Sequence, residues 1–200
     1  MCPLEAITHL ADVGAAQEAA TRVMLSDEAL MLQFHAGSQQ SLEELFARYR
    51  DPLYGFFRRR LRDKERANDL SQETWIAVMK GVERYQPRAL FRTYLYGIAL
   101  KILAGDRRKS AKHEPVIGTA EIPVLDASDS HHHIREALDK LDATDREVIM
   151  LREYEQLSYA EIAALLHIPV NTVRSRLFRA RLALKSLLEP GSEQRPASRR

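Results

Sequence analysis

The sequence predicts an all-α fold made of two small helical domains joined by a flexible linker, the second a helix-turn-helix domain. Three observations support this prediction. Apolar residues recur at helical spacing through residues 26–110 and again through 132–188. Between them, residues 111–131 combine prolines and a glycine with small polar residues, which favours a linker. Near the C-terminus, two short amphipathic helices are separated by a tight turn.

Size and charge agree with two folded domains. The chain has 200 residues, 45% of them hydrophobic, and its formal net charge is only +2. The basic residues are nevertheless clustered, in stretches 58–66, 101–112 and 174–185. Such clusters indicate contact with a polyanion, although a solvated surface has a similar composition.

The cellular setting follows from what the sequence lacks. Cys2 is the only cysteine, so no disulfide forms within the chain, which fits a reducing compartment. Residues 1–24 do not resemble a signal peptide, and no apolar run is long enough to span a bilayer. We therefore expect a cytoplasmic protein without membrane insertion.

No enzyme signature is found. The sequence has no phosphate-binding glycine loop, no His-Glu-x-x-His, no paired-cysteine zinc pattern and no nucleophile elbow. His131, His132 and His133 are adjacent at the linker edge, so they point in divergent directions and no further ligands complete a site. We expect no catalytic residue, no cofactor and no metal.

The first domain begins after an alanine-rich extension, residues 1–25, to which we assign no function. Ser26 is a plausible cap for a helix that runs to about His35 and ends at Gly37. Ser41 and Glu44 have the spacing of a capping box that opens the next helix.

Proline and a change of apolar pattern mark the next boundaries. Pro52 is expected to kink or restart the second helix. A third helix is predicted from about Lys64 to Tyr85. Its expected buried side consists of Ala67, Leu70, Thr74, Val78 and Val82. A separate, mostly polar stripe consists of Asp69, Gln72, Glu73, Ile76 and Lys80, and taken alone it is typical of a hydrated surface.

The last helix of the first domain starts at Phe91 and becomes basic. Its expected core side consists of Phe91, Leu95, Ile98 and Ile102. Tyr94, Lys101 and Arg108 lie along another side, where aromatic and cationic groups are suited to unpaired bases and phosphates. A plain core helix with a basic end is the alternative.

The second domain resumes helical spacing from Ile134, and Thr144 with Glu147 predicts another capping box. Residues 189–200 are expected to be a disordered tail. Ser158 with Glu161 predicts a third box, at the start of the first helix of the helix-turn-helix pair. Pro169 suits the first position of the second helix.

That second helix divides into two faces. Val173, Leu177, Ala180 and Leu184 form one apolar stripe. Small polar groups and arginines occupy the rest, and there is no acidic residue from Asn171 to Lys185. Such a helix suits a DNA major groove, where arginine and asparagine can recognise base edges. An ordinary amphipathic surface helix is the alternative.

These residues resemble a known family. Leu157-Ser-Tyr-Ala-Glu-Ile-Ala, followed by Ile168-Pro-Val-Asn-Thr-Val-Arg-Ser-Arg-Leu-Phe-Arg-Ala-Arg, is similar to region 4 of bacterial extracytoplasmic-function sigma factors, which binds the promoter −35 element. The resemblance implies that −35 DNA is bound by Asn171, Thr172, Arg174, Ser175, Arg176, Phe178, Arg179 and Arg181. Of these, Arg176 and Arg181 are expected to hold phosphate.

Two stretches of the first domain resemble the same family. Asp69-Leu-Ser-Gln-Glu-Thr-Trp is similar to region 2.2, and Phe91-Arg-Thr-Tyr-Leu-Tyr-Gly-Ile-Ala is similar to regions 2.3 and 2.4. The resemblance implies that Asp69, Gln72, Glu73, Ile76 and Lys80 dock on the β′ clamp helices of core RNA polymerase. It also implies that the promoter −10 element is bound by Arg92, Tyr94, Lys101, Arg107 and Arg108.

Three positions depart from the family pattern. His167 stands at the turn where glycine is usual, and a positive φ there is costly for a residue with a β-carbon. Gly97 stands where arginine is usual and Lys101 where asparagine is usual. We expect the last two to alter the −10 preference.

The resulting hypothesis is a sigma factor that binds core RNA polymerase, including its β flap, and directs promoter recognition and opening. The resemblance also implies control by an anti-sigma factor. The alternatives are a stand-alone helix-turn-helix regulator, which needs only the second half, and an interaction module for an acidic partner. The stripe that begins at Asp69 favours the sigma factor, because neither alternative requires it.

Overall fold

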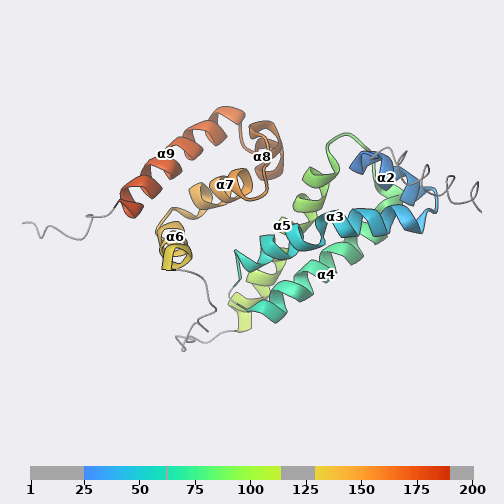
Figure 1. Cartoon of the computed structure of the whole chain (residues 1–200), viewed down its shortest axis with the longest axis horizontal. Coiled ribbons are helices and arrows are strands. Elements are labelled where there is room, and N and C mark those ends of the chain that lie inside the picture. The colour runs from blue at the N-terminus through green and yellow to red at the C-terminus, as the bar shows by residue number, and fades with distance from the viewer. Residues whose placement is uncertain (1–24, 62, 114–128, 190–200) are drawn as a thin grey trace, which may run out of the picture.

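The computed structural model describes residues 25–61, 63–113 and 129–189, and every regular element in these ranges is a helix (Figure 1). The elements are α2 (Asp27–His35), α3 (Gln39–Arg58), α4 (Lys64–Lys80), the 3₁₀ turn η1 (Val82–Arg84), α5 (Phe91–His113), α6 (Asp129–Asp139), α7 (Ala143–Glu153), α8 (Tyr159–Leu166) and α9 (Val170–Leu188). The prediction of an all-α fold is confirmed. The linker and terminal segments expected from the sequence lie almost entirely outside the described residues.

Helices α2 to α5 form one group and α6 to α9 form a second (Figure 1). We call them the first and the second helical group. Within the described ranges, no helix is both long and apolar enough to cross a membrane.

Helix α3 supplies the centre of the first core. Its predicted start is wrong: the helix begins at Gln39, and the N-cap is Ser38, which accepts a hydrogen bond from the Ser41 N–H. Ser41 is therefore inside the first turn, where its hydroxyl donates to Gln33 at 2.8 Å. The helix also continues through Pro52 without a restart. Proline removes only one backbone hydrogen bond, and the buried side chains that follow, Leu53, Phe56 and Phe57, hold the helix in place.

Helix α4 lies beside α3 and ends earlier than the sequence predicts. It stops at Lys80 because Gly81 forms the C-cap, and the predicted last residues form η1 instead. Glycine is required here for close packing, since a β-carbon on Gly81 would lie 2.6 Å from the Tyr94 hydroxyl of α5. The expected buried side is confirmed at Ala67, Leu70, Thr74 and Val78, whereas Val82 is only partly buried.

Helix α2 fixes the start of α5. The predicted cap is confirmed, since Ser26 accepts a hydrogen bond from the Ala29 N–H, and Gly37 follows the helix with φ of +103°. Glu28 then accepts the Phe91 N–H at 2.7 Å, which satisfies a free donor at the first turn of α5. The helix that carries the predicted −10 residues is thereby held at its beginning.

Two predictions at the start of the second group are wrong. Helix α6 begins at Asp129, so the three adjacent histidines lie on a helix and not at the edge of the linker. Helix α7 is capped by Asp142 and not by Thr144: the Asp142 carboxylate accepts the N–H groups of Thr144 at 2.9 Å and Asp145 at 3.3 Å. Asp142 stands two residues before Thr144, the start of the predicted box, and its carboxylate satisfies two donors at once.

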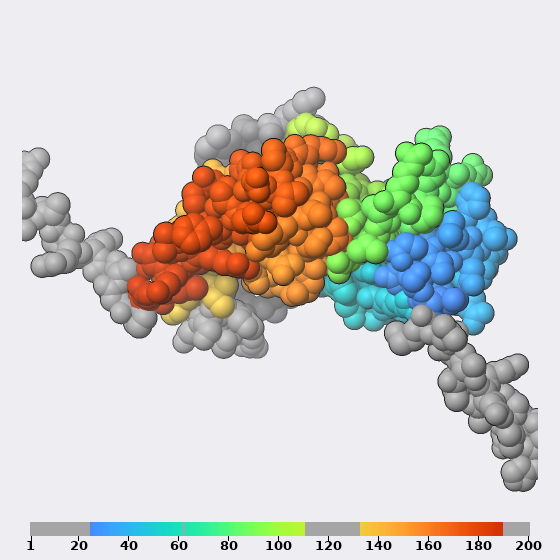
Figure 2. All heavy atoms as spheres, turned by 90° about the horizontal axis from the view of Figure 1, so that it is seen from above, coloured from blue at the N-terminus to red at the C-terminus, as the bar shows by residue number. Residues whose placement is uncertain are grey.

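The two groups touch along α5 and α8, whose surfaces meet without a gap in the space-filling view (Figure 2). Buried residues of both groups belong to one continuous apolar cluster. Arg174, Arg179 and Arg181 of α9 are exposed, and Arg176 is partly buried.

Candidate nucleic-acid interface

The first helix and the turn of the helix-turn-helix pair are built as the sequence predicts. Ser158 accepts the Glu161 N–H at 3.2 Å, and Glu161 accepts the Ser158 N–H at 2.8 Å, so both halves of the capping box are present. His167 has φ of 54° and ψ of 44°, which confirms the expected left-handed turn. Pro169 is the N-cap of α9 and not its first helical residue, because its ψ of 146° is extended.

Helix α9 is held by its apolar side. Val173, Leu177 and Ala180 are buried against α7 and α8, and Leu184 is partly buried at the edge of the same core. The opposite face is open, and Phe178 is 69% exposed. A large aromatic side chain that is this exposed is available for contact with a ligand.

Most of the predicted −35 residues lie on the open face. The exposed members are Asn171, Arg174, Ser175, Phe178, Arg179 and Arg181, and the partly buried members are Thr172 and Arg176. They extend along a helix of 19 residues, or about 28 Å at 1.5 Å per residue. An α-helix, about 10–12 Å across with its side chains, fits the major groove, which is about 12 Å wide.

One carboxylate that the sequence analysis missed contacts two arginines of this face. Asp145 of α7 is only 9% exposed and accepts two hydrogen bonds from Arg179, at 3.1 and 3.3 Å. The same carboxylate lies 3.8 Å from Arg176. The hydrogen bond to Asp145 raises the pKa of the Arg179 guanidinium, which remains charged. No local spacing reveals this contact, because 34 residues separate the partners.

Another acid of α7 lies at the far end of the predicted −35 face. Arg181 donates to Glu153 at 2.7 Å, and both side chains are about half exposed. Exposed pairs of this kind contribute little to stability and are readily exchanged for another anion. A phosphate can therefore compete with Glu153 for this arginine.

In the first group, the predicted polymerase-binding stripe of α4 is exposed at all five positions, Asp69, Gln72, Glu73, Ile76 and Lys80. Its apolar member, Ile76, is 44% exposed. Two further apolar side chains are exposed, Met79 on α4 and Phe46 on the neighbouring helix α3. The Phe46 ring lies 5.2 Å from that of the buried Trp75 of α4. The sequence analysis did not single out Phe46.

The predicted −10 residues differ in their exposure and in whether another side chain already binds them. Lys101, Arg107 and Arg108 are exposed on the second half of α5. Tyr94 is partly buried, with its ring 5.1 Å from that of Tyr85. Arg92 donates to Glu161 of α8 at 2.8 Å through two nitrogen atoms. The second half of this helix therefore exposes basic side chains, whereas Arg92 near its start is already paired with Glu161.

Within the described ranges, no group of three or more histidine, cysteine or acidic side chains is placed to hold a metal ion. The side chains of His131 and His132 lie outside the described set, and that of His133 is exposed.

Comparisons with known proteins identify the family. Models described as "Sigma-70 region 2" and "Sigma-70, region 4" match residues 45–112 and 131–184. RNA polymerase sigma factor CarQ of Myxococcus xanthus is 32% identical over 166 residues, which cover 79% of this chain and 95% of CarQ. ECF RNA polymerase sigma-E factor of Haemophilus influenzae is 29% identical over 185 residues, covering 83% of this chain and 97% of that protein.

Solved structures agree in fold. CnrH, solved in complex with the cytosolic domain of CnrY, aligns with a TM-score of 0.66 and 27% identity, covering 83% of this chain and 99% of CnrH. The sigma factor RpoE of Bartonella quintana, solved with the anti-sigma factor NepR, has a TM-score of 0.63 at 22% identity, covering 74% of this chain and 97% of RpoE. The chain therefore belongs to the sigma-70 family, as an extracytoplasmic-function sigma factor, a class of RNA polymerase subunit that directs promoter recognition and opening at the start of transcription.

Proposed function

We propose that this sigma factor divides its work between two domains, residues 26–110 and residues 132–188. The first docks on core RNA polymerase and engages the −10 element, and the second binds the −35 element and the β flap. The chain itself performs no covalent chemistry, since the polymerase makes the RNA, and it acts where the polymerase is found, in the cytoplasm. The observation that carries this proposal is the exposed arginine face of α9 on a buried apolar back.

For the −35 element, the proposed base contacts come from Arg174, Ser175, Phe178 and Arg179. Phe178 suits a thymine methyl group because its side chain is apolar and 69% exposed. Arg176 and Arg181 are assigned to phosphates. Asn171 and Thr172 stand at the start of α9, where bases and phosphates are both within reach of the helix N-terminus.

For the polymerase, the proposed contact is the α4 stripe, with Phe46 and Met79 as additional apolar members. An apolar centre among charged residues is the usual composition of a protein interface. Asp69 and Glu73 lie 3.8 and 3.9 Å from Arg66, so the acidic side of the stripe is held in place by a neighbouring cation.

For the −10 element, Lys101, Arg107 and Arg108 offer an exposed cationic track, and Arg92 with Tyr94 extends it toward the start of α5. Unpaired bases need both cations and aromatic faces. Lys101 carries an ammonium group at the position where the family usually has the side-chain amide of asparagine. We therefore propose that binding of the −10 element depends less on hydrogen bonds to one particular base than in relatives with asparagine.

Control by an anti-sigma factor is part of the proposal and rests on family resemblance. CnrH is solved with a domain of another protein, which supports a protein partner for this fold.

Run-off transcription with purified core polymerase on a promoter library tests the proposed function. We expect RNA from a subset of promoters only when the chain is present, and the recovered sequences should share a −35 and a −10 element. A stand-alone regulator would bind duplex DNA without polymerase and would yield no transcript with core enzyme alone. That result would refute the proposal.

A further inference from the structure

We propose that Arg66 is a positioning residue for the docking of polymerase on α4, an inference that rests on the proposed function of the α4 stripe. Anchored on Asp106 of α5, Arg66 holds the two exposed acids of the stripe, Asp69 and Glu73, in the arrangement in which they meet their partner. Arg66 lies outside the stripe itself, about one helical turn before Asp69.

The anchor of Arg66 is a carboxylate on the neighbouring helix. Helix α4 packs beside α5 (Figure 1), and the Asp106 side chain is only 9% exposed there. Arg66 donates to Oδ1 of Asp106 from Nε, at 2.8 Å, and also from Nη2. This hydrogen bonding raises the pKa of the Arg66 guanidinium, which therefore remains charged. Two charge-assisted hydrogen bonds to a nearly buried carboxylate fix the plane of the guanidinium group.

The remaining nitrogen of the guanidinium faces the stripe. Nη1 lies 3.8 Å from Oδ2 of Asp69 and 3.9 Å from Oε1 of Glu73. These distances are too long for hydrogen bonds, so Arg66 attracts the two acids without saturating them. Their side chains are 57% and 49% exposed. A cation of another molecule can therefore reach both.

The charges show what Arg66 contributes. One guanidinium among three carboxylates cannot neutralise the cluster, so the stripe stays acidic. What Arg66 can do is restrict the side-chain conformations of Asp69 and Glu73 before a partner arrives. Conformational freedom that is already lost does not have to be removed on docking, which is worth about two- to tenfold in affinity for each side chain.

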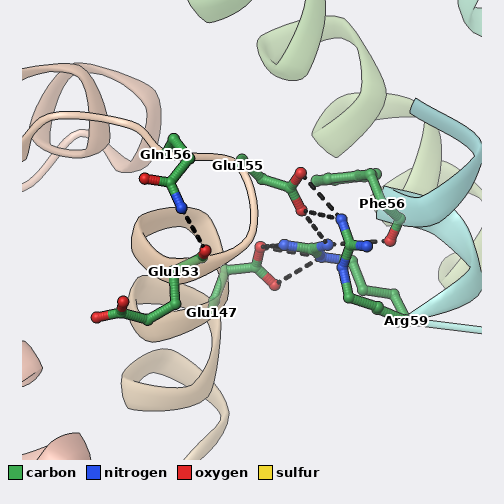
Figure 3. Close-up of polar contacts among 7 residues, drawn as sticks. Phe56, Arg59, Glu147, Glu153, Glu155 and Gln156 are labelled. Atoms are coloured by element: carbon green, nitrogen blue, oxygen red, sulfur yellow. Dashed lines mark hydrogen bonds and ion pairs between the residues drawn. The ribbon is translucent and has the colours of Figure 1, made fainter. Parts of the chain in front are cut away.

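An ordinary structural ion pair is the alternative, and the contact of Arg59 with Glu155 is an example of one (Figure 3). There Arg59 donates to both carboxylate oxygens, at 2.9 and 3.0 Å, and the glutamate side chain is 1% exposed. Such a carboxylate is saturated and out of reach of another molecule. At Arg66 only the anchor is buried, and the two other acids are open to solvent.

Arginine is suited to this role by the shape of its charged group. The planar guanidinium offers separate edges, Nε and Nη2 to Asp106 and Nη1 to the stripe. Lysine carries the same charge at one point on a flexible stem, so it can pair with the anchor or with the stripe but cannot hold one to the other. Arg66→Lys therefore separates positioning from charge.

Equilibrium titration of the full-length chain with core RNA polymerase measures docking. We expect Arg66→Lys and Asp106→Asn each to raise the Kd at least about fivefold, although neither residue belongs to the stripe. The matched controls are the same two substitutions at Arg50 and Asp51, which form an exposed ion pair on α3 at 2.9 Å, outside the stripe. We expect the controls to change the Kd less than about twofold. An Arg66→Lys chain that docks as wild type would show that charge suffices, and would overturn the proposal.

Urea denaturation of the same variants separates docking from stability. A variant that is about 90% folded has lost only about a tenth of its competent chains, which raises the apparent Kd about 1.1-fold. A fivefold rise in a folded variant therefore cannot come from lost stability. A rise in Kd no larger than the unfolded fraction explains, in Arg66→Lys and in Asp106→Asn, would make the pair purely structural and refute the proposal.

Double variants test whether Arg66 acts through the acids of the stripe. Asp69→Asn and Glu73→Gln should each weaken docking of the wild-type chain, and we expect both losses to shrink when Arg66→Lys is already present. Fully additive losses would mean that Arg66 does not act through these acids, which contradicts the proposal.

The single acid variants also distinguish the two levels of inference. If neither Asp69→Asn nor Glu73→Gln weakens docking, the proposed function of the stripe is wrong, and the role of Arg66 is refuted with it. If the acids matter and Arg66→Lys does not, only the role of Arg66 is refuted.

Discussion

The two helical groups use their aromatic residues differently. In the first, Phe56, Phe57 and Phe91 are fully buried, and Trp75, Tyr85 and Tyr96 are nearly so. Among described residues 129–189 no aromatic side chain is buried: Phe178 is on the α9 face, and Tyr154 lies under Arg59 of the other group. The first group therefore depends on aromatic core side chains, and the second on aliphatic core side chains such as Leu151, Leu157 and Ile162 and on helix caps.

The largest effect is expected from the aromatic core. Phe56 is fully buried, its ring lies 5.1 Å from Phe57 and 5.4 Å from Tyr96, and Arg60 stacks on it. Phe56→Ala should lower the free energy of unfolding by about 4 kcal/mol. Urea denaturation followed by circular dichroism measures this loss. The exposed Phe46 is the control, and a similar loss for Phe46→Ala would contradict the comparison.

The aliphatic core should be somewhat less sensitive. Leu177 anchors α9 and is 1% exposed. Leu177→Ala should cost about 3 kcal/mol, and −35 binding should fall with it because the recognition face loses its support. Leu182→Ala on the same helix, where the side chain is 59% exposed, should change stability by less than about 0.5 kcal/mol. Equal losses would mean that α9 is not packed by the side described.

Acid should loosen the second group from the first. Burial alone would raise the pKa of Glu161. Hydrogen bonds from Arg92, Ser158 and Thr93 outweigh it and lower this pKa to about 2, from an ordinary value of 4.5. Because the folded value lies below the unfolded one, the stabilisation is complete above about pH 4.5 and is lost as the pH falls toward about 2. Its upper limit is on the order of 3 kcal/mol.

Comparison with Glu161→Gln measures this contribution, since glutamine retains the capping box but not the charge. The difference in unfolding free energy between wild type and variant should shrink between pH 5 and pH 2. A difference that does not depend on pH would exclude the proposed linkage.

For the DNA face, Arg179→Ala should lower −35 affinity by about 1–3 kcal/mol and relax the preference at one base pair. Arg146→Ala is the control, because Arg146 pairs with Asp139 away from α9. Competition binding of the holoenzyme to promoter variants measures both. A uniform loss across all sequences would reassign Arg179 to phosphate contact.

The smallest effect concerns the caps. Ser158→Ala should cost about 1 kcal/mol, because it removes one half of a complete capping box. Ser38→Ala should cost less, since its acceptor distance is longer, 3.4 Å against 3.2 Å, and the aromatic core holds α3 in place. Thermal unfolding ranks the two, and the reverse order would contradict the view that caps matter more in the second group.

Local patterns predicted much of this molecule. The Ser158–Glu161 box and the buried stripe of α9 follow from residues within a few positions of each other, and the positive φ at His167 follows from the family resemblance; all are confirmed. Two predicted N-caps were wrong, because several residues near each helix start are able to cap it. The actual N-caps, Ser38 and Asp142, stand three and two residues before the predicted boxes.

Contacts between distant residues could not be predicted. Arg59 and Arg60 lie in a basic cluster that suggests a polyanion, yet the structure pairs them with Glu155 and Glu147, 87 to 96 residues away. Periodicity carries no information about such partners. The same limitation concealed Asp145 behind Arg179, whereas the helical spacing of the apolar stripe placed that arginine on the exposed face.

Asp145 has a further consequence for how such a protein searches a chromosome. A resident counter-charge beside Arg179 must be displaced before the guanidinium can take another partner. A single passing phosphate offers little to offset that displacement, whereas a guanine edge offers two acceptors at once. With Arg179 in its proposed role as a base contact, we therefore expect random sequence to be held more briefly than a promoter and less time to be lost at wrong sites.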